Sequence, residues 1–304
     1  MRQTTRTRHT RRATATLAAV VLLATGGVAG CDSSSDSGGN GAPATRRPSP
    51  TPTPAWDRSP GSIAAVGDSI TRGFDACDVL SDCPEASWAT GTDTEVRSLA
   101  LRLIGAPAVA QRSWNLARTG AVVADLPAQM AQAAARKPEL VAVMVGANDA
   151  CAETAELMTP VEEFRASVVA SMARLRRTAP KAQVYVSSVP DLKRLWSTGR
   201  GNPLGRQVWK LGLCASMLGD AEDESAEAEQ RRATVHARVI AYNDVLKSVC
   251  AKDQRCRYDG GAVFAYRFGG DQLSRWDWFH PSKDGQGRLA EIAYRNVTAA
   301  QPPK

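Results

Sequence analysis

Two kinds of hydrophobic pattern alternate along residues 61–304. Short and nearly continuous apolar runs predict buried strands, at 62–67, 108–116, 140–145 and 183–189. Longer stretches with apolar residues three or four positions apart predict helices, at 95–104, 126–136, 160–178, 222–249 and 283–296. Apolar strands that alternate with helices favour a parallel sheet covered on both faces. We therefore predict an α/β domain that binds its ligand at the carboxyl ends of the strands.

The first thirty residues have the pattern of an export signal. Five arginines lie within residues 2–12, and an uncharged stretch with an apolar centre follows, from Ala13 to Gly30. A basic start, a short apolar run and small residues before a cut site are typical of a secretory signal. A transmembrane helix is less well supported, because Thr and Gly dilute the run and a span needs about 20 strongly apolar residues. We predict that residues 1–30 are removed.

The end of this segment, Val28-Ala29-Gly30-Cys31, resembles the bacterial lipobox. The resemblance implies that Cys31 receives a diacylglycerol thioether, becomes the mature N-terminus and anchors the protein to the cell membrane, facing outside. An ordinary secreted protein that is cut elsewhere is the alternative. The adjacent Arg11 and Arg12 leave open whether export uses the general or the twin-arginine route.

Residues 31–60 have the composition of a linker. A Ser/Gly-rich part gives way to a Pro/Thr-rich part at 48–54. Such a segment cannot bury enough apolar surface to order itself. The remaining residues, 61–304, suit one domain, which at this size buries roughly 70% of the surface of its unfolded chain. We expect a monomer, tethered to the membrane through its lipid anchor.

The net charge of the chain does not indicate a nucleic-acid partner. The full chain has 38 basic and 31 acidic residues, a net of +7. Residues 1–30 hold five arginines and no acid, so the mature chain has 38 − 5 = 33 basic residues and a net charge of 33 − 31 = +2. The basic balance is largely a property of the leader, and it gives no support to nucleic-acid binding.

The cysteine count after Cys31 is even and predicts disulfides. Six cysteines in an exported chain suggest three bridges, and six cysteines allow 15 pairings. Proximity in the sequence suggests the pairs Cys77–Cys83 and Cys250–Cys256, which leaves Cys151–Cys214. A metal site is not expected, because no Cys-x-x-Cys occurs and no histidine lies near a cysteine pair at ligand spacing.

Histidine narrows the search for acid–base chemistry. The chain has three histidines, and His9 lies in the leader, which leaves His236 and His280. His236 falls in a helical stretch. His280 follows Asp277 by three residues and precedes a proline, which favours a loop. A carboxylate there can hold one ring nitrogen and leave the other free as a base. An ordinary loop histidine with an acidic neighbour is the alternative.

Three further motifs follow predicted strands. Ser69, in Gly67-Asp68-Ser69, comes directly after the first strand and is the candidate nucleophile. Asn148 follows the strand at 140–145, where its amide can point at a developing oxyanion. Gly120 follows the second strand, and glycine lets its backbone N–H approach a ligand closely. A helix cap, a turn and a loop glycine are the ordinary structural alternatives for these three positions.

The order of these blocks resembles the SGNH (GDSL) hydrolase family over about residues 63–289. The resemblance implies a three-layer α/β/α sandwich on a five-stranded parallel sheet, and an ester-cleaving enzyme that uses no metal or cofactor. By position it implies that Ser69 is the nucleophile, His280 the general base and Asp277 its orienting partner. Ser69 N–H, Gly120 N–H and the Asn148 amide take the place of the oxyanion hole. Asp68 and Asp149 match structural positions of the motifs.

The substrate is left open by the sequence. The candidates are a lipase or carboxylesterase, a carbohydrate deacetylase, a thioesterase and an acyltransferase, all acting on small-molecule, lipid or glycan esters. A non-catalytic surface protein that binds a ligand or glycan is the alternative from another class. The segment 192–219 is expected to be a surface excursion held by Cys214, or else a wall or lid of an acyl pocket. Trp276 and Trp278 flank Asp277 and are expected to line the pocket or to pack beneath its loop.

Overall fold

The computed structural model describes residues 56–303, which belong to one compact unit. The predicted signal segment, Cys31 and the linker up to residue 55 lie outside the described residues. None of the described helices is long and apolar enough to cross a membrane. The end of the predicted linker contacts the domain: Trp56 Nε1 donates to Val297 O at 2.9 Å, and Asp57 N donates to Gln183 Oε1 at 2.6 Å.

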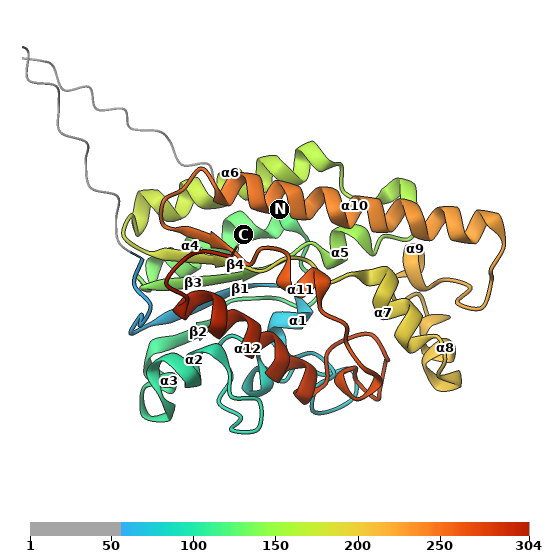
Figure 1. The fold of residues 1–304 in the computed structure, drawn as a ribbon, viewed down its shortest axis with the longest axis horizontal. Helices are drawn as coiled ribbons and strands as arrows, with labels where there is room; N and C mark the ends of the chain where they lie inside the picture. Colours follow the sequence, from blue (N-terminus) through green and yellow to red (C-terminus); the bar gives the residue numbers. More distant parts are fainter. Residues whose placement is uncertain (1–55, 304) are drawn as a thin grey trace, which may run out of the picture. The chain divides into compact units, whose positions relative to one another are not determined.

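Five parallel strands form the sheet at the centre of the fold (Figure 1). They are β1 Ile63–Gly67, β2 Ser113–Asn115, β3 Leu140–Met144, β4 Gln183–Val186 and β5 Cys256–Tyr258. Their order across the sheet is β2-β1-β3-β4-β5, with every neighbouring pair parallel. β1, β3 and β4 are buried along their whole length, as expected where helices cover both faces. The predicted α/β fold with a five-stranded parallel sheet is confirmed.

Two helical layers cover the sheet (Figure 1). One layer holds α4 Leu126–Ala135, α6 Val161–Thr178 and α10 Ala226–Cys250, in which α6 packs against the other two. The other holds α2 Leu99–Ile104, α3 Ala106–Arg112 and α12 Lys283–Thr298. The five helices predicted from periodicity are α2, α4, α6, α10 and α12, and their ends differ from the prediction by four residues or fewer.

Short helices occupy the connections. The α-helices are α1 Ser69–Arg72, α5 Ala147–Ala150, α7 Leu192–Gly199, α8 Pro203–Trp209, α9 Ala215–Leu218 and α11 Ala262–Ala265. The 3₁₀ turns are η1 Pro84–Ala86, η2 Val123–Asp125, η3 Ala155–Leu157 and η4 Gly270–Gln272. α1 and α5 begin just beyond the carboxyl ends of β1 and β3, so they carry the residues of the predicted motifs to the edge of the sheet where ligands bind.

The predicted strand at 108–116 is wrong for most of its length. The structure has α3 up to Arg112 and only a three-residue strand, β2, after it. Pro107 lies in the first turn of α3, where its fixed φ suits a helix, and the alanines around it are the best helix formers. The apolar run therefore reflects a short helix that is partly buried, followed by an edge strand.

The segment 192–219 is held by the Cys151–Cys214 disulfide, as expected, but it is more ordered than a simple surface loop. It folds into α7, α8 and α9, and both of its tryptophans, Trp196 and Trp209, are buried. The side chains of Asp191 and Asn202 cap α7 and α8 by accepting backbone hydrogen bonds. Trp209 Nε1 also donates to Asp277 O at 2.8 Å, so this segment supports the loop that carries the candidate histidine.

Three disulfides are present, with the pairing that proximity in the sequence suggested. Cys77–Cys83 and Cys250–Cys256 each close a short loop, and Cys151–Cys214 joins residues 63 positions apart. In the chain-entropy account a bridge that closes a loop of this length stabilises the folded state by roughly 4 kcal/mol. Cys151–Cys214 therefore holds the 192–219 segment to the end of α5.

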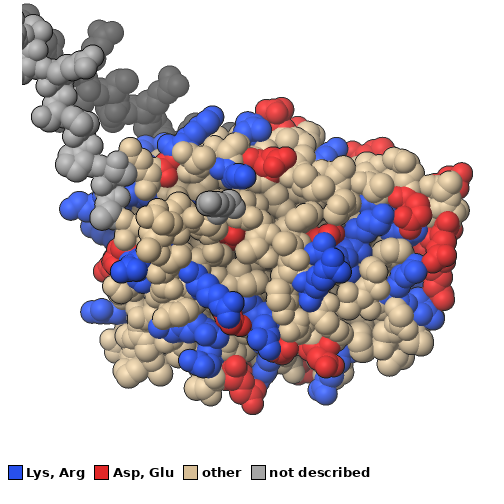
Figure 2. Space-filling view, in the orientation of Figure 1, with Lys and Arg blue, Asp and Glu red and all other residues tan. Residues whose placement is uncertain are grey.

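Charges of both signs are interspersed over the face of the domain in Figure 2. Ion pairs among residues 56–303 include the half-buried Arg176–Asp253 at 2.6 Å and the more exposed Lys193–Glu229 at 3.1 Å. A surface of this kind favours solubility and does not present one long stripe of a single sign on this face.

Candidate active site

The turn after β1 places one serine at the edge of the sheet. Gly67 has φ +147, and a Cβ there would lie 2.0 Å from Met144 O, so only glycine fits. Asp68 then caps α1, because its side chain accepts the N–H of Ile70 at 3.0 Å. Ser69 is the first residue of α1 and lies at the carboxyl edge of the sheet.

Ser69, His280 and Asp277 form one continuous chain of hydrogen bonds. Ser69 Oγ lies 2.8 Å from His280 Nε2, although the two residues are 211 positions apart in the sequence. His280 Nδ1 donates to Asp277 Oδ2. The N–H groups of Phe279 and His280 both donate to Asp277 Oδ1, each at 2.9 Å. One carboxylate oxygen therefore folds the loop, and the other orients the ring.

The three groups are buried, and burial makes their mutual charges strong. Ser69 is 6% exposed, His280 7% and Asp277 3%. Burial by itself lowers the pKa of His280, but the charge of Asp277 and its hydrogen bond outweigh this, and the pKa of His280 is raised. Burial by itself raises the pKa of Asp277, but the charge and hydrogen bond of His280 outweigh it, and that pKa is lowered. Both shifts favour the imidazolium–carboxylate pair.

The three predicted oxyanion donors come from neighbouring loops. Asn148 lies in α5 and gives one N–H of its amide to Ala121 O at 2.9 Å, which joins its loop to the residue after Gly120. Gly120 is exposed and has φ +79, a conformation that favours glycine. Within residues 56–303 the backbone N–H groups of Ser69 and Gly120 donate to no other part of the chain.

Two buried glutamines hold the serine turn, and the sequence analysis missed both. Gln129 of α4 clamps Gly67: its Oε1 accepts Gly67 N at 2.7 Å and its Nε2 donates to Gly67 O at 2.9 Å. Gln286 of α12 donates to Ile70 O at 2.8 Å and accepts Trp88 N at 2.9 Å. Each glutamine lies among the buried residues of its helix, at a position where an apolar residue is expected. A polar residue on the apolar face of a helix is the signal that the sequence offered for both.

Asp68 and Asp149 brace the loops, as the resemblance implied. Asp149 Oδ2 accepts Val123 N at 2.9 Å, and Asp149 O accepts Thr159 N at 3.1 Å. Burial raises the pKa of Asp149 to about 6 and that of Asp68 to about 7. Both carboxyls are therefore costly to ionise, and neither hydrogen-bonds to Ser69 or His280.

The other described histidine is not part of this chain of hydrogen bonds. His236 lies in α10, where its Nδ1 is 3.1 Å from Asp191 Oδ1 and its ring packs against Phe264.

The two tryptophans that flank Asp277 both line a cavity. Trp276 and Trp278 lie along a space of about 410 Å³ beside the Asp277 loop. Trp278 also packs against Gly205 of α8.

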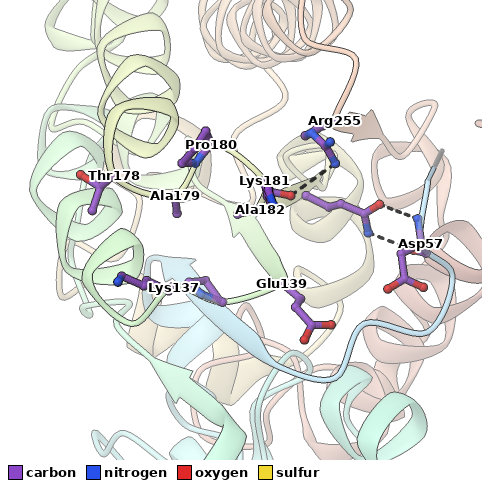
Figure 3. A pocket seen from close by; sticks show the side chains of 11 residues that line it. Asp57, Lys137, Glu139, Thr178, Ala179, Pro180, Lys181, Ala182 and Arg255 are labelled. Atoms are coloured by element: carbon purple, nitrogen blue, oxygen red, sulfur yellow. Dashed lines mark hydrogen bonds between the residues drawn. The ribbon is translucent and has the colours of Figure 1, made fainter. Parts of the chain in front are cut away.

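The larger cavity in Figure 3 lies elsewhere. Its volume is about 560 Å³, and its lining includes Lys137, Glu139, Lys181 and Gln183. These residues lie before or at the start of β3 and β4. The cavity is therefore at the amino edge of the sheet, opposite the edge that carries Ser69.

Two groups among residues 56–303 have metal-ligating side chains close together. Cys77 and Cys83 lie near Glu85, but they form a disulfide and have no thiolate to offer. Asp75 lies near Asp277 and His280, whose facing atoms are hydrogen-bonded to each other. At both places, atoms that could bind a metal already take part in another bond: the two sulfurs in a disulfide, and the Asp277 and His280 atoms in a hydrogen bond.

Comparison with known proteins bears directly on this constellation. The model of one protein family, described as GDSL-like lipase/acylhydrolase, matches residues 63–293. The chain belongs to the GDSL-like lipase/acylhydrolase family. The match covers all five strands and every residue of the Ser69–His280–Asp277 chain. No curated protein matches the sequence.

Several solved structures are similar to this GDSL-family chain. A chain described as a GDSL-like lipase from Parabacteroides merdae has 15% sequence identity and a TM-score of 0.50, with 82% of this chain and 100% of that chain covered. Phospholipase A1 from Streptomyces albidoflavus has 21% identity and a TM-score of 0.45, covering 79% and 100%. A family 3 carbohydrate esterase from Clostridium thermocellum has 13% identity and a TM-score of 0.45, covering 77% and 93%. At these identities the likeness concerns the fold.

Proposed function

We propose that this GDSL-family protein is a serine esterase that cleaves carboxylic ester bonds through an acyl-enzyme on Ser69. The observation that carries the proposal is the buried hydrogen-bond chain from Ser69 Oγ through His280 to Asp277, with 2.8 Å between the serine oxygen and the ring nitrogen. A nucleophile, a base and a group that orients the base are the three parts that acyl transfer requires.

The reaction proceeds in two halves. His280 Nε2 takes the proton of Ser69 as Oγ attacks the ester carbonyl carbon, and the tetrahedral adduct forms. His280 then gives this proton to the leaving alcohol, and Ser69 keeps the acyl group. Water enters, loses a proton to His280 and attacks the acyl carbon, and the acid is released as the proton returns to Ser69. Asp277 stays ionised and stabilises the imidazolium in each half.

The developing oxyanion is bound by Ser69 N–H, Gly120 N–H and the second N–H of the Asn148 amide. The support is that the two backbone groups have no other acceptor within residues 56–303, while one amide hydrogen of Asn148 is used to hold the loop at Ala121. Removing one such donor costs roughly 2.7–4 kcal/mol of transition-state stabilisation in a comparable site. Asn148 therefore both shapes the loop and stabilises the charge.

The enzyme acts at the outer surface of the cell. The support is in the sequence: the signal-like segment, the lipobox-like Val28–Cys31 and the linker that follows. The three disulfides agree with an oxidising compartment. Mass spectrometry of the protein from membranes tests the anchor, because a diacylglycerol on Cys31 adds a thioether-linked lipid that a Cys31→Ser variant lacks.

Hydrolysis of p-nitrophenyl esters from acetyl to palmitoyl tests the proposed reaction. We expect the wild type to turn over and Ser69→Ala to lose nearly all of the rate, with far-ultraviolet circular dichroism showing that both are equally folded. The profile over chain length then distinguishes an acetyl esterase from a lipase. Equal activity of the two proteins would refute Ser69 as the nucleophile, and inertness of the wild type on every ester would favour transfer to another acceptor or a binding protein.

A further inference from the structure

A third carboxyl lies beside the Ser69–His280–Asp277 chain. Asp75 is 2% exposed, and one of its carboxylate oxygens, one of Asp277 and a ring nitrogen of His280 all lie within 4.8 Å of one another. None of the sequence motifs includes Asp75. It comes six residues after Ser69, in the loop that follows α1.

The loop that carries Asp75 is built with unusual backbone conformations. Asp75 has φ +57 and Leu80 has φ +52, both in the left-handed region that non-glycine residues seldom occupy. Asp75 N donates to Ser81 O at 2.9 Å, and Leu80 N donates to the Asp75 carboxylate. The disulfide Cys77–Cys83 closes the same loop. These contacts fix the backbone around Asp75 in a conformation that costs energy.

The same loop is tied to the one that carries the histidine. Ser274 Oγ donates to Asp75 O at 2.8 Å. The backbone N–H of the same serine donates to His280 O at 2.7 Å. The serine joins the two loops, so the Asp75 carboxyl faces Asp277 in a fixed position.

Two buried carboxyls this close cannot both be ionised without a cost. Burial, and next the charge and hydrogen bond of Asp277, raise the pKa of Asp75 to about 6. Since His280 holds the pKa of Asp277 low, Asp75 is the member of the pair that takes up the proton. Its O–H then has Asp277 as an acceptor. Above its pKa, Asp75 adds a second negative charge beside His280.

We propose that Asp75 is a positioning residue that sets the proton affinity of His280 through Asp277. As a neutral acid it donates to Asp277 and lessens the negative charge that the imidazole feels. As a carboxylate it strengthens that charge and keeps His280 more basic. The proposal rests on the proposed function for its effect on turnover, but its effect on His280 is independent of any activity.

The charged groups around this cluster are few. His280 is faced by Asp277, Asp75 and Asp68, all of which raise its pKa when they are ionised. The cavity on the outer side of Asp75 is lined by two acids and two bases: Asp271, Asp284, Arg275 and Lys283. Lys283 is paired with Asp93 at 2.8 Å. The charge change that reaches His280 from the loop after α1 is therefore that of Asp75.

The matched substitutions are Asp75→Asn and Asp78→Asn. The first removes the ionisable carboxyl but keeps an N–H donor for Asp277. The second removes one negative charge from the same loop at an exposed position that is not in the cluster. A merely structural role of Asp75 changes stability without changing the titration of His280.

The experiment is an NMR titration of His280 in the full-length protein labelled with ¹⁵N-histidine, with His236→Gln to assign the signals. We expect the wild-type His280 shifts to show a second inflection near pH 6 from Asp75. We expect the pKa of His280 to fall by roughly one unit in Asp75→Asn, the lower end for a nearby charge, and to stay unchanged in Asp78→Asn. The acid limb of kcat/KM then moves to lower pH by the same amount, about a tenfold gain on that limb.

The outcomes separate the two proposals. A single inflection in the wild type, or the same pKa of His280 in all three proteins, overturns the role of Asp75. Should Asp75→Asn fail to fold, the curve of Asp68→Asn decides: Asp68 is the other raised carboxyl that acts on His280, so an inflection near pH 6 that remains in this variant supports Asp75, and its loss overturns the role. If the pKa of His280 shifts but no ester is hydrolysed, the proposed function fails and the inference stands.

Discussion

The domain contains two histidine–aspartate pairs, and only one of them lies against a nucleophile. His280 and Asp277 are almost fully buried, with side chains 8% and 5% exposed, and Ser69 Oγ completes the chain at 2.8 Å. In the pair His236–Asp191 the histidine side chain is 32% exposed and its neighbour is the ring of Phe264. The same two residue types thus form a buried pair against a serine in one place and a half-exposed pair against an aromatic ring in the other.

The two aspartates also differ in what else they hold. Asp277 accepts the ring N–H of His280 through one oxygen and the backbone N–H groups of its own loop through the other, and its acidic neighbour is Asp75. Asp191 caps α7 through Arg194 N and pairs with the Arg194 guanidinium at 3.3 Å. A carboxylate shared with a cap and an arginine has less charge to offer a histidine. A histidine–carboxylate pair is therefore no sign of catalysis until its other partners are known.

Exchanging each histidine for glutamine gives the largest expected difference. His280→Gln removes the proposed base for the Ser69 proton, and we expect kcat/KM for p-nitrophenyl acetate to fall by roughly 10⁴-fold or more. His236→Gln, the matched control, leaves kcat/KM close to that of the wild type. A comparable loss in both variants would mean that the two pairs are not distinguished by Ser69.

Exchanging each aspartate for asparagine gives a smaller difference. Asp277→Asn keeps a side chain of the same shape but removes the charge that stabilises the imidazolium, and we expect kcat to fall by roughly 10³–10⁴-fold. Asp191→Asn keeps an oxygen to cap α7 and leaves kcat close to the wild type. Rates at several pH values measure both effects. If Asp277→Asn keeps full activity, the serine and histidine act without a charged partner.

The sequence motifs contain Ser69, His280 and Asp277, which the structure brings together, but they do not contain the residues that hold them in place. Ser69 stands in a short motif directly after a predicted strand, and His280 stands in a loop three residues after Asp277. β1, β3 and β4 were predictable because they are buried along their whole length, and apart from Gln183 at the start of β4 they hold only apolar residues, glycine and tyrosine. β2 and β5 are only three residues long and contain both polar and apolar residues. Segments this short show no hydrophobic pattern from which a strand could be predicted.

The residues that support the site could not be recognised from local sequence patterns, because their partners lie far away in the sequence. Gln129 and Gln286 are helical glutamines whose role appears only when their helices pack beside the Ser69 turn. Asp75 gains its neighbours from a loop whose Ser274 lies 199 residues further along the chain. The 108–116 run was assigned to a strand because short apolar segments of a helix and of a strand look alike in sequence.

The smallest expected difference concerns stability, and it tests whether the Ser69 turn is under electrostatic strain. Asp68 is fully buried beside Ser69, and burial raises its pKa to about 7. A carboxyl whose pKa is higher in the folded than in the unfolded state binds more protons when folded, so its contribution to stability is largest in acid and is lost as pH rises through about 7. Between pH 5 and 8 this lowers the free energy of unfolding by roughly 2–3 kcal/mol. In Asp68→Asn we expect that part of the decline to disappear in urea titrations at the two pH values, whereas Asp191→Asn should follow the wild-type decline. An identical decline in Asp68→Asn would place the pH dependence in other groups and leave the two regions electrostatically alike.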